Sequence, residues 1–219
     1  MFANQNSGKV GVDQIVQPGE SDGEAAERCV FGIKNNVIGT LAAFVPIKFG
    51  GVQTNTVDGA IISTSANLVN TSTLKDGYGV PTSKTVAAFL TQRVQKYGRA
   101  TGYTSGTVTT VNMTVNIPYN PGTAKFINQF NVTPDSNFSS FGILGDSGSL
   151  VVDFNNNPVG LLFAGNGFAT FGNPINDVLS QLATQLKLNQ GVPADTVLSV
   201  DSSPPRATGK DMRSQPNSP

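Results

Sequence analysis

Histidine and tryptophan are absent from the 219 residues of this chain, and cysteine occurs only once. Because Cys29 stands alone, no intrachain disulfide and no cysteine-rich metal site can be drawn. Without histidine, a conventional zinc site is excluded as well. The sequence therefore predicts no metal and no cofactor.

Charge and long apolar runs are also scarce. The 14 basic and 14 acidic side chains give a formal net charge of zero, so nothing favours capture of nucleic acid or of an anionic membrane. No apolar run approaches the roughly 18 residues of a membrane span. Residues 1–8 lack the basic start and apolar middle of a signal peptide.

Gly, Thr, Ser, Asn and Val are plentiful, and this mixture favours short strands joined by tight turns. The alternation of apolar and polar residues, with turn-forming residues between the runs, predicts a mainly β protein. Residues 64–81 are predicted to be loop, and the pattern leaves residues 87–97 undecided. The strands are expected within residues 8–19, 29–33, 37–47, 57–63, 108–117, 126–132, 149–154 and 159–164.

One segment has helical periodicity. Asn173 followed by Pro174 is typical of a helix start, with Asn173 as N-cap and proline at the first helical position. Apolar residues then recur at helical spacing as far as Leu186. Residues 202–219 carry too few apolar side chains to build a core and are predicted to be disordered.

The sequence Gly145-Asp146-Ser147-Gly148-Ser149 is the most informative segment. Attack on a peptide carbonyl needs a hydroxyl on a sharply turned loop, with backbone N–H groups aimed at the developing oxyanion. Glycines on both sides of Ser147 permit that turn and the close approach of a substrate. An apolar segment leads into the motif, and an apolar hairpin follows it.

With these residues the chain resembles the trypsin-like (chymotrypsin-fold) serine peptidases, in particular their disulfide-free bacterial and plant members. The resemblance runs from about residue 1 to residue 188. It implies an all-β fold, a chymotrypsin-like double β-barrel with an incomplete first barrel and a C-terminal helix. The implied divisions are residues 1–95 (first-barrel remnant), 96–188 (second barrel and closing helix) and 189–219 (disordered tail).

The resemblance also implies roles for individual residues. Ser147 would be the nucleophile, and the backbone N–H groups of Gly145 and Ser147 would form the oxyanion hole. Asp58, within the apolar run 57–61, takes the place of the triad aspartate. A carboxylate in such a strand is costly to bury unless a partner hydrogen-bonds it, which agrees with that assignment.

The sequence departs from this family because it has no triad histidine. Residues 1–6 resemble those that follow it, so the chain is expected to be an N-terminally truncated fragment of a serine endopeptidase. Without the base, Ser147 would keep only the modest assistance of the oxyanion hole and of binding. Because the first barrel could not close, residues 1–90 are expected to be loosely folded or prone to aggregation.

The expected partner is a peptide or protein substrate, bound in a cleft lined by Phe141, Phe163, Ala164 and Gly165. Phe141 lies six residues before Ser147, where the family often sets specificity. No acid stands there, so a preference for Lys or Arg is not indicated, and an apolar pocket is expected.

Two alternatives stay open on the sequence alone. One is a pseudopeptidase that keeps the fold as a binding module. The other is an unrelated Thr- and Asn-rich β protein with a coincidental motif, which predicts that Asp58 and Ser147 lie far apart.

Overall fold

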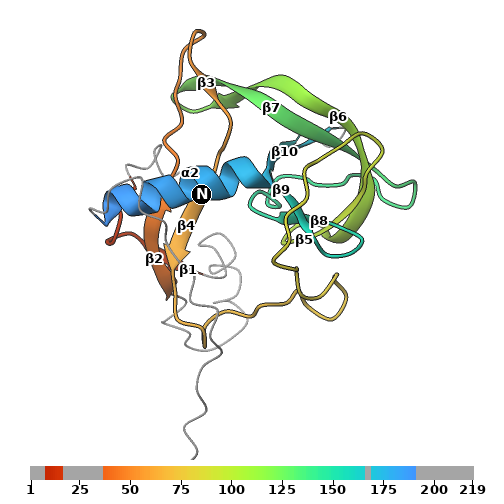
Figure 1. The fold of residues 1–219 in the computed structure, drawn as a ribbon, viewed down its shortest axis with the longest axis horizontal. Helices are drawn as coiled ribbons and strands as arrows, with labels where there is room; N and C mark the ends of the chain where they lie inside the picture. Colours follow the sequence, from red (N-terminus) through yellow and green to blue (C-terminus); the bar gives the residue numbers. More distant parts are fainter. Residues whose placement is uncertain (1–7, 17–36, 166–168, 191–219) are drawn as a thin grey trace, which may run out of the picture.

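The computed structural model of the chain describes residues 8–16, 37–165 and 169–190, and Figure 1 shows their arrangement. Ten strands are followed by one helix at the C-terminal end of the described residues. The elements are β1 (Gln14–Val16), β2 (Val37–Phe44), β3 (Thr54–Asn55), β4 (Ala60–Ser63), β5 (Arg93–Gly98), β6 (Gly102–Tyr119), β7 (Gly122–Pro134), β8 (Leu150–Asp153), β9 (Pro158–Gly165), β10 (Thr170–Pro174) and α2 (Ile175–Asn189). The expected all-β class with a C-terminal helix is confirmed.

The larger sheet contains seven strands in the order β10-β9-β8-β5-β6-β7-β3. Its longest feature is the antiparallel hairpin of β6 and β7, which turns between Tyr119 and Gly122. Strand β10 pairs with β9 on one side and with β7 on the other. The ladder of hydrogen bonds therefore returns to its starting strand, and the sheet curls around a core (Figure 1).

The smaller sheet contains three antiparallel strands in the order β1-β2-β4. It lies beside the larger sheet, and α2 extends from the end of β10 toward β2 and β4 (Figure 1). Residues 56–59 connect β3 of the larger sheet to β4 of the smaller one. Asp58 therefore lies where the chain passes from one sheet to the other.

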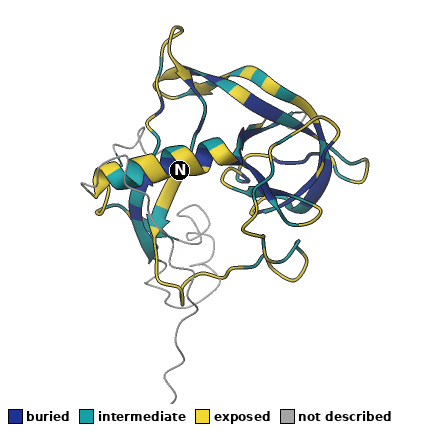
Figure 2. Ribbon diagram, in the orientation of Figure 1, coloured by how far each residue is buried: buried dark blue, intermediate teal, exposed yellow. Residues whose placement is uncertain are grey.

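Buried side chains concentrate in the larger sheet (Figure 2). One cluster lies inside the curled sheet, and a second lies between the β6–β7 hairpin and β9. A third cluster joins Val178 and Leu182 of α2 to Val57. Val57 precedes Asp58 in the chain, so its burial against the helix holds the backbone next to Asp58 in place. The first cluster consists of Val94, Val108, Phe130, Val132, Phe141, Val151, Val159 and Leu162.

The helix begins one residue later than the sequence predicts. Pro174 occupies the N-cap position, with no side-chain capping hydrogen bond, and the first helical residue is Ile175. Asn173, the expected cap, is fully buried, and its amide bonds to Gln129 of β7. This buried partner competes successfully with the local capping interaction.

Residues 64–81 contain no strand, and the predicted hairpin around residues 155–157 is the β8–β9 pair. The undecided segment 87–97 supplies most of β5. The expected division between residues 95 and 96 falls inside β5, all of which pairs in the larger sheet. The expected strand at 29–33 and most of the expected disordered tail lie outside the described residues.

None of the helices in the described ranges is long and apolar enough to cross a membrane.

Candidate active site

The loop that carries Ser147 turns sharply at two glycines. Gly145 has φ +103° and Gly148 has φ +91°, a region that L-residues with side chains rarely adopt. Two tight turns follow each other, since Asp146 N–H donates to Ile143 O (3.0 Å) and Ser149 N–H donates to Asp146 O (3.0 Å). Gly148 N–H donates to Leu162 O (2.7 Å), which ties the loop to β9. The turn that the sequence predicts is therefore present.

The polar groups of this loop differ in whether they have a protein partner. The hydroxyl of Ser147 donates to the backbone oxygen of Phe163 (3.2 Å). Among the described residues, neither the N–H of Gly145 nor that of Ser147 donates to a protein acceptor. These two donors are thus available to an oxyanion.

Asp146 is almost completely buried and anchors the loop from below. Its carboxylate accepts from the N–H groups of Ala100 (2.8 Å) and Ile143 (3.0 Å), and from the hydroxyl of Thr101 (2.9 Å). Burial alone would raise the pKa of Asp146, but these donors and the Lys96 charge outweigh it, and the pKa lies below its ordinary value. Asp146 is therefore a buried, fixed anion next to Ser147 in the loop.

The cation facing Asp146 is Lys96 of β5. Its Nζ lies 3.7 Å from Asp146 Oδ2, and both side chains are inaccessible to solvent. Lys96 also donates to Gly102 O (3.1 Å) and to the hydroxyl of Thr101. Burial lowers the pKa of Lys96, whereas the charge of Asp146 acts in the opposite direction.

Asp58 lies at the junction between the two sheets. One carboxylate oxygen accepts a hydrogen bond from the hydroxyl of Tyr119 (2.9 Å), and its backbone N–H donates to Asn173 Oδ1 (3.1 Å). Burial raises the pKa of Asp58, and the hydrogen bond from Tyr119 opposes this rise. Burial and the charge of Asp58 raise the pKa of Tyr119 well above its ordinary value, so the phenol stays protonated and acts as a donor.

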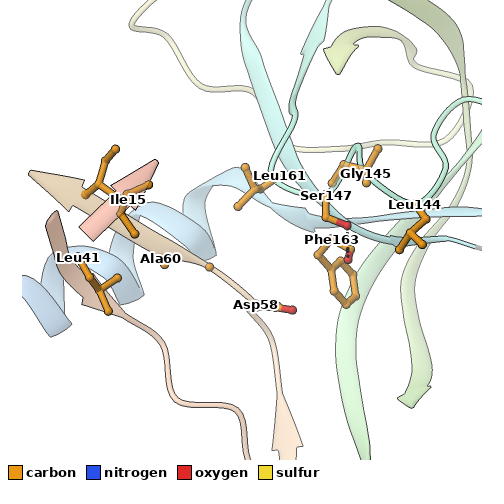
Figure 3. A pocket seen from close by; sticks show the side chains of 13 residues that line it. Ile15, Leu41, Asp58, Ala60, Leu144, Gly145, Ser147, Leu161 and Phe163 are labelled. Carbon is orange, nitrogen blue, oxygen red and sulfur yellow. Dashed lines mark hydrogen bonds between the residues drawn. The ribbon is translucent and has the colours of Figure 1, made fainter. Parts of the chain in front are cut away.

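Asp58, Gly145, Ser147 and Phe163 line one cavity of about 440 Å³. Figure 3 shows Asp58 on the side of the smaller sheet and Ser147 on the side of the larger sheet, both at the same pocket. The rest of the lining is mainly apolar, with Ile15, Leu41, Ala60, Ile62, Leu144, Leu161 and Leu162. The structure thus brings the two predicted catalytic residues to one cavity.

A second cavity of about 480 Å³ shares Leu144, Ser147, Leu162 and Phe163 with the first. Ala164 and Gly165 line it, as does Phe171 of β10. Phe141 does not: its side chain is fully buried in the core of the curled sheet and faces away from both cavities. The expectation that Phe141 lines the cleft is therefore corrected, because the loop between β7 and β8 turns this ring into the core.

Lys96, Tyr119 and Asn173 belong to the surroundings of the site but were not identified from the sequence as contributing to it. For Lys96 the available signal was indirect: an aspartate buried in the motif requires a cation or hydrogen-bond donors beside it. No local pattern indicates that Tyr119, at the tip of a hairpin, reaches Asp58. In the described part of the chain, no group of three or more His, Cys, Asp or Glu side chains could hold a metal ion.

No family model matches the chain, and no curated protein matches it. Solved structures to which the fold is similar are bacterial chymotrypsin-fold serine proteases at low sequence identity. Chymotrypsin of Cellulomonas bogoriensis is 26% identical, with 64% of this chain and 70% of that chain covered and a TM-score of 0.46. Protease A of Thermobifida fusca is 25% identical, with 65% and 70% covered and a TM-score of 0.47. An alpha-lytic protease homolog, N4, is 20% identical, with 73% and 82% covered and a TM-score of 0.47.

Proposed function

We propose that this chain, whose structural neighbours are chymotrypsin-fold serine proteases, carries the nucleophile and the acid of a serine endopeptidase site. The observation that supports the proposal is the arrangement at one cavity. Ser147 lies on a turn between two glycines, its N–H and that of Gly145 have no acceptor in the described part of the chain, and Asp58 lies on the facing wall.

In the proposed reaction Ser147 Oγ attacks the carbonyl carbon of a peptide bond. The negative charge that develops on the carbonyl oxygen is stabilised by the N–H groups of Gly145 and Ser147. The C–N bond then breaks, the leaving amine takes up the serine proton through a general base, and water hydrolyses the acyl-serine. Asp58 would orient that base and stabilise its protonated form.

None of the 219 residues is histidine, so they contain no imidazole to act as the general base. Tyr119 cannot replace it, since its raised pKa keeps the phenol protonated at neutral pH. Free imidazole carries the same functional group and can be added in solution. This makes the proposal testable on the chain as it stands.

The second cavity supports a preference for apolar side chains next to the cleaved bond. None of the described residues that line it is charged, and the apolar residues Ile117, Leu162 and Phe171 are among them. A Lys, Arg or Glu side chain would lose its hydration there without gaining a charged partner. Phe163 and Leu144, shared by both cavities, place this space beside Ser147.

The test uses two peptidyl diphenyl phosphonates that differ only in the residue next to phosphorus, Phe or Lys. Attack by Ser147 forms a P–O bond and releases phenoxide, and the adduct is read by mass spectrometry. We expect imidazole to accelerate labelling of Ser147, the Phe probe to react at least about tenfold faster, and Ser147→Ala to abolish labelling. Ser149→Ala is the matched control, because the Ser149 hydroxyl is bonded to Asp146 O (2.6 Å) and should not react.

Labelling that persists in Ser147→Ala, or a folded protein that never reacts with either probe, would overturn the proposal. Equal rates with both probes would overturn only the apolar preference.

A further inference from the structure

The backbone around Asp58 is held by two buried amide side chains on different strands. Asn173 of β10 and Gln129 of β7 are both fully inaccessible to solvent. Asn173 Nδ2 donates to Gln129 Oε1 (2.6 Å), so the two amides form one unit. Burying two amides is costly unless they are hydrogen-bonded, and a pair of apolar side chains would fill the same space at lower cost.

This amide pair binds the backbone on both sides of Val57. Asn173 Oδ1 accepts from the N–H of Asp58 (3.1 Å), and Gln129 Nε2 donates to the C=O of Thr56 (3.0 Å). Val57, between these two contacts, is fully buried against the helix. Residues 56–58 are thus fixed by the amide pair and by apolar packing against α2.

Local backbone geometry turns Gln129 toward Asp58. Along β7 the even-numbered residues Ala124 and Phe126 face the core, but at Asn128 the alternation fails. Asn128 has φ +62° and is exposed, its side chain donating to Asp177 Oδ2 (2.8 Å), while Gln129 turns inward. A β-bulge of this kind re-aims a side chain, here toward the segment that carries Asp58.

We propose that Asn173 and Gln129 are positioning residues for the proposed active site and act as one unit to hold Asp58 at the cavity. The inference rests on the proposed function, since Asp58 matters to catalysis only if Ser147 reacts. The pair reaches Asp58 only through its backbone, so it sets the place of the carboxylate without touching a substrate. A general base bonded to Asp58 would then depend on the amide pair for its position relative to Ser147.

The test compares Asn173→Leu, Gln129→Met and the double variant with the unchanged chain. Gln92→Met is the matched control, because Gln92 is also a buried glutamine, but it accepts from the N–H of Phe89 (3.1 Å), away from both cavities. Two quantities are measured. One is the imidazole-dependent rate of phosphonate labelling at saturating probe, and the other is the pKa of the Asp58 carboxyl by carbon-detected NMR.

We expect each single variant to lower the saturating rate by roughly tenfold to a hundredfold, as a misplacement of about 1 Å would. The probe concentration at half-saturation should change little, because the second cavity is untouched. The double variant should be no slower than the slower single variant, since the amides act together. The raised pKa of Asp58 should fall toward 3.8 as the carboxylate moves into water.

Rates and an Asp58 pKa that match those of Gln92→Met would overturn the inference, and so would additive losses in the double variant. If one variant fails to fold, the other still decides the question. Failure of the proposed function has a different signature: Ser147 would not label in the unchanged chain, while the Asp58 pKa would still report whether the amides position it.

Discussion

Asp146 shows at the scale of a single residue how the loop of Ser147 is kept in its turn. The carboxylate accepts from the N–H groups of Ala100, Thr101 and Ile143 and faces the Lys96 ammonium. Gly98 leaves room for it, because a Cβ at Gly98 would lie 2.4 Å from Asp146 Oδ1. A neutral amide at residue 146 would turn an NH₂ group toward these donors and leave Lys96 as an unpaired buried cation.

We therefore expect Asp146→Asn to lower the free energy of unfolding by about 3 kcal/mol or more at pH 7, because removing one partner of a buried ion pair is strongly destabilising. Urea unfolding followed by circular dichroism measures this loss. Asp135→Asn is the control, since the side chains of the Arg93–Asp135 pair are 55% and 23% exposed and the pair should contribute less than about 1 kcal/mol.

The same residue predicts a pH dependence. The pKa of Asp146 is lower in the folded chain than the ordinary 3.8, so its contribution to stability is complete above 3.8 and is lost as the pH falls through the folded-state pKa. The difference between the unchanged chain and Asp146→Asn should therefore shrink at acidic pH. A difference that stays constant down to the folded-state pKa would contradict the role given to this carboxylate.

At the scale of the strand and helix, local pattern predicts the elements better than their ends. Two apolar runs around the turn-forming residues 155–157 correctly predict the β8–β9 hairpin, and helical periodicity correctly predicts α2. The sequence cannot show that Asn173 leaves its capping role for Gln129, because that contact joins residues 44 positions apart. Phe141 was expected at the cleft from its position six residues before Ser147, and nothing in the local sequence indicates that its ring turns into the core.

Strands β9 and β10 each have a glycine where they pack against the ring of Phe130. A Cβ at Gly160 would lie 2.4 Å from Cε1 of this fully buried ring, and one at Gly172 would lie 2.2 Å from Cζ. We expect Gly160→Ala to destabilise the fold by about 1–3 kcal/mol through overpacking. Urea unfolding should show a smaller cost for the same change in a Phe130→Leu background, where the ring is gone.

Gly51→Ala is the control for this effect, because a Cβ at Gly51 meets no atom within 4 Å. Gly51→Ala should change the free energy of unfolding by less than about 1 kcal/mol, because it acts mainly by reducing the conformational entropy of the unfolded chain. An equal cost of Gly160→Ala in both backgrounds would mean that contact with Phe130 is not the cause.

At the scale of the whole molecule, the two sheets are unequally supported. The larger sheet encloses two clusters of buried side chains, whereas β4 has no fully buried residue and β2 has only Leu41 and Ala43. Within the described residues, β4 has no strand on its outer side. The smaller sheet therefore depends on α2 and on the segment around Val57 for its attachment.

This difference predicts that the smaller sheet opens without the larger one. Local opening needs less free energy where few apolar side chains are buried, so amides of β2 and β4 should exchange with solvent deuterium at least about tenfold faster than those of β6 and β8. Hydrogen exchange read by NMR measures both sets in one sample. Equal protection, together with a single sharp thermal transition, would show that the chain folds as one cooperative unit. Faster exchange confined to the smaller sheet would mean instead that Asp58, at the junction, belongs to the part of the site that moves, while Ser147 stays on the stable part.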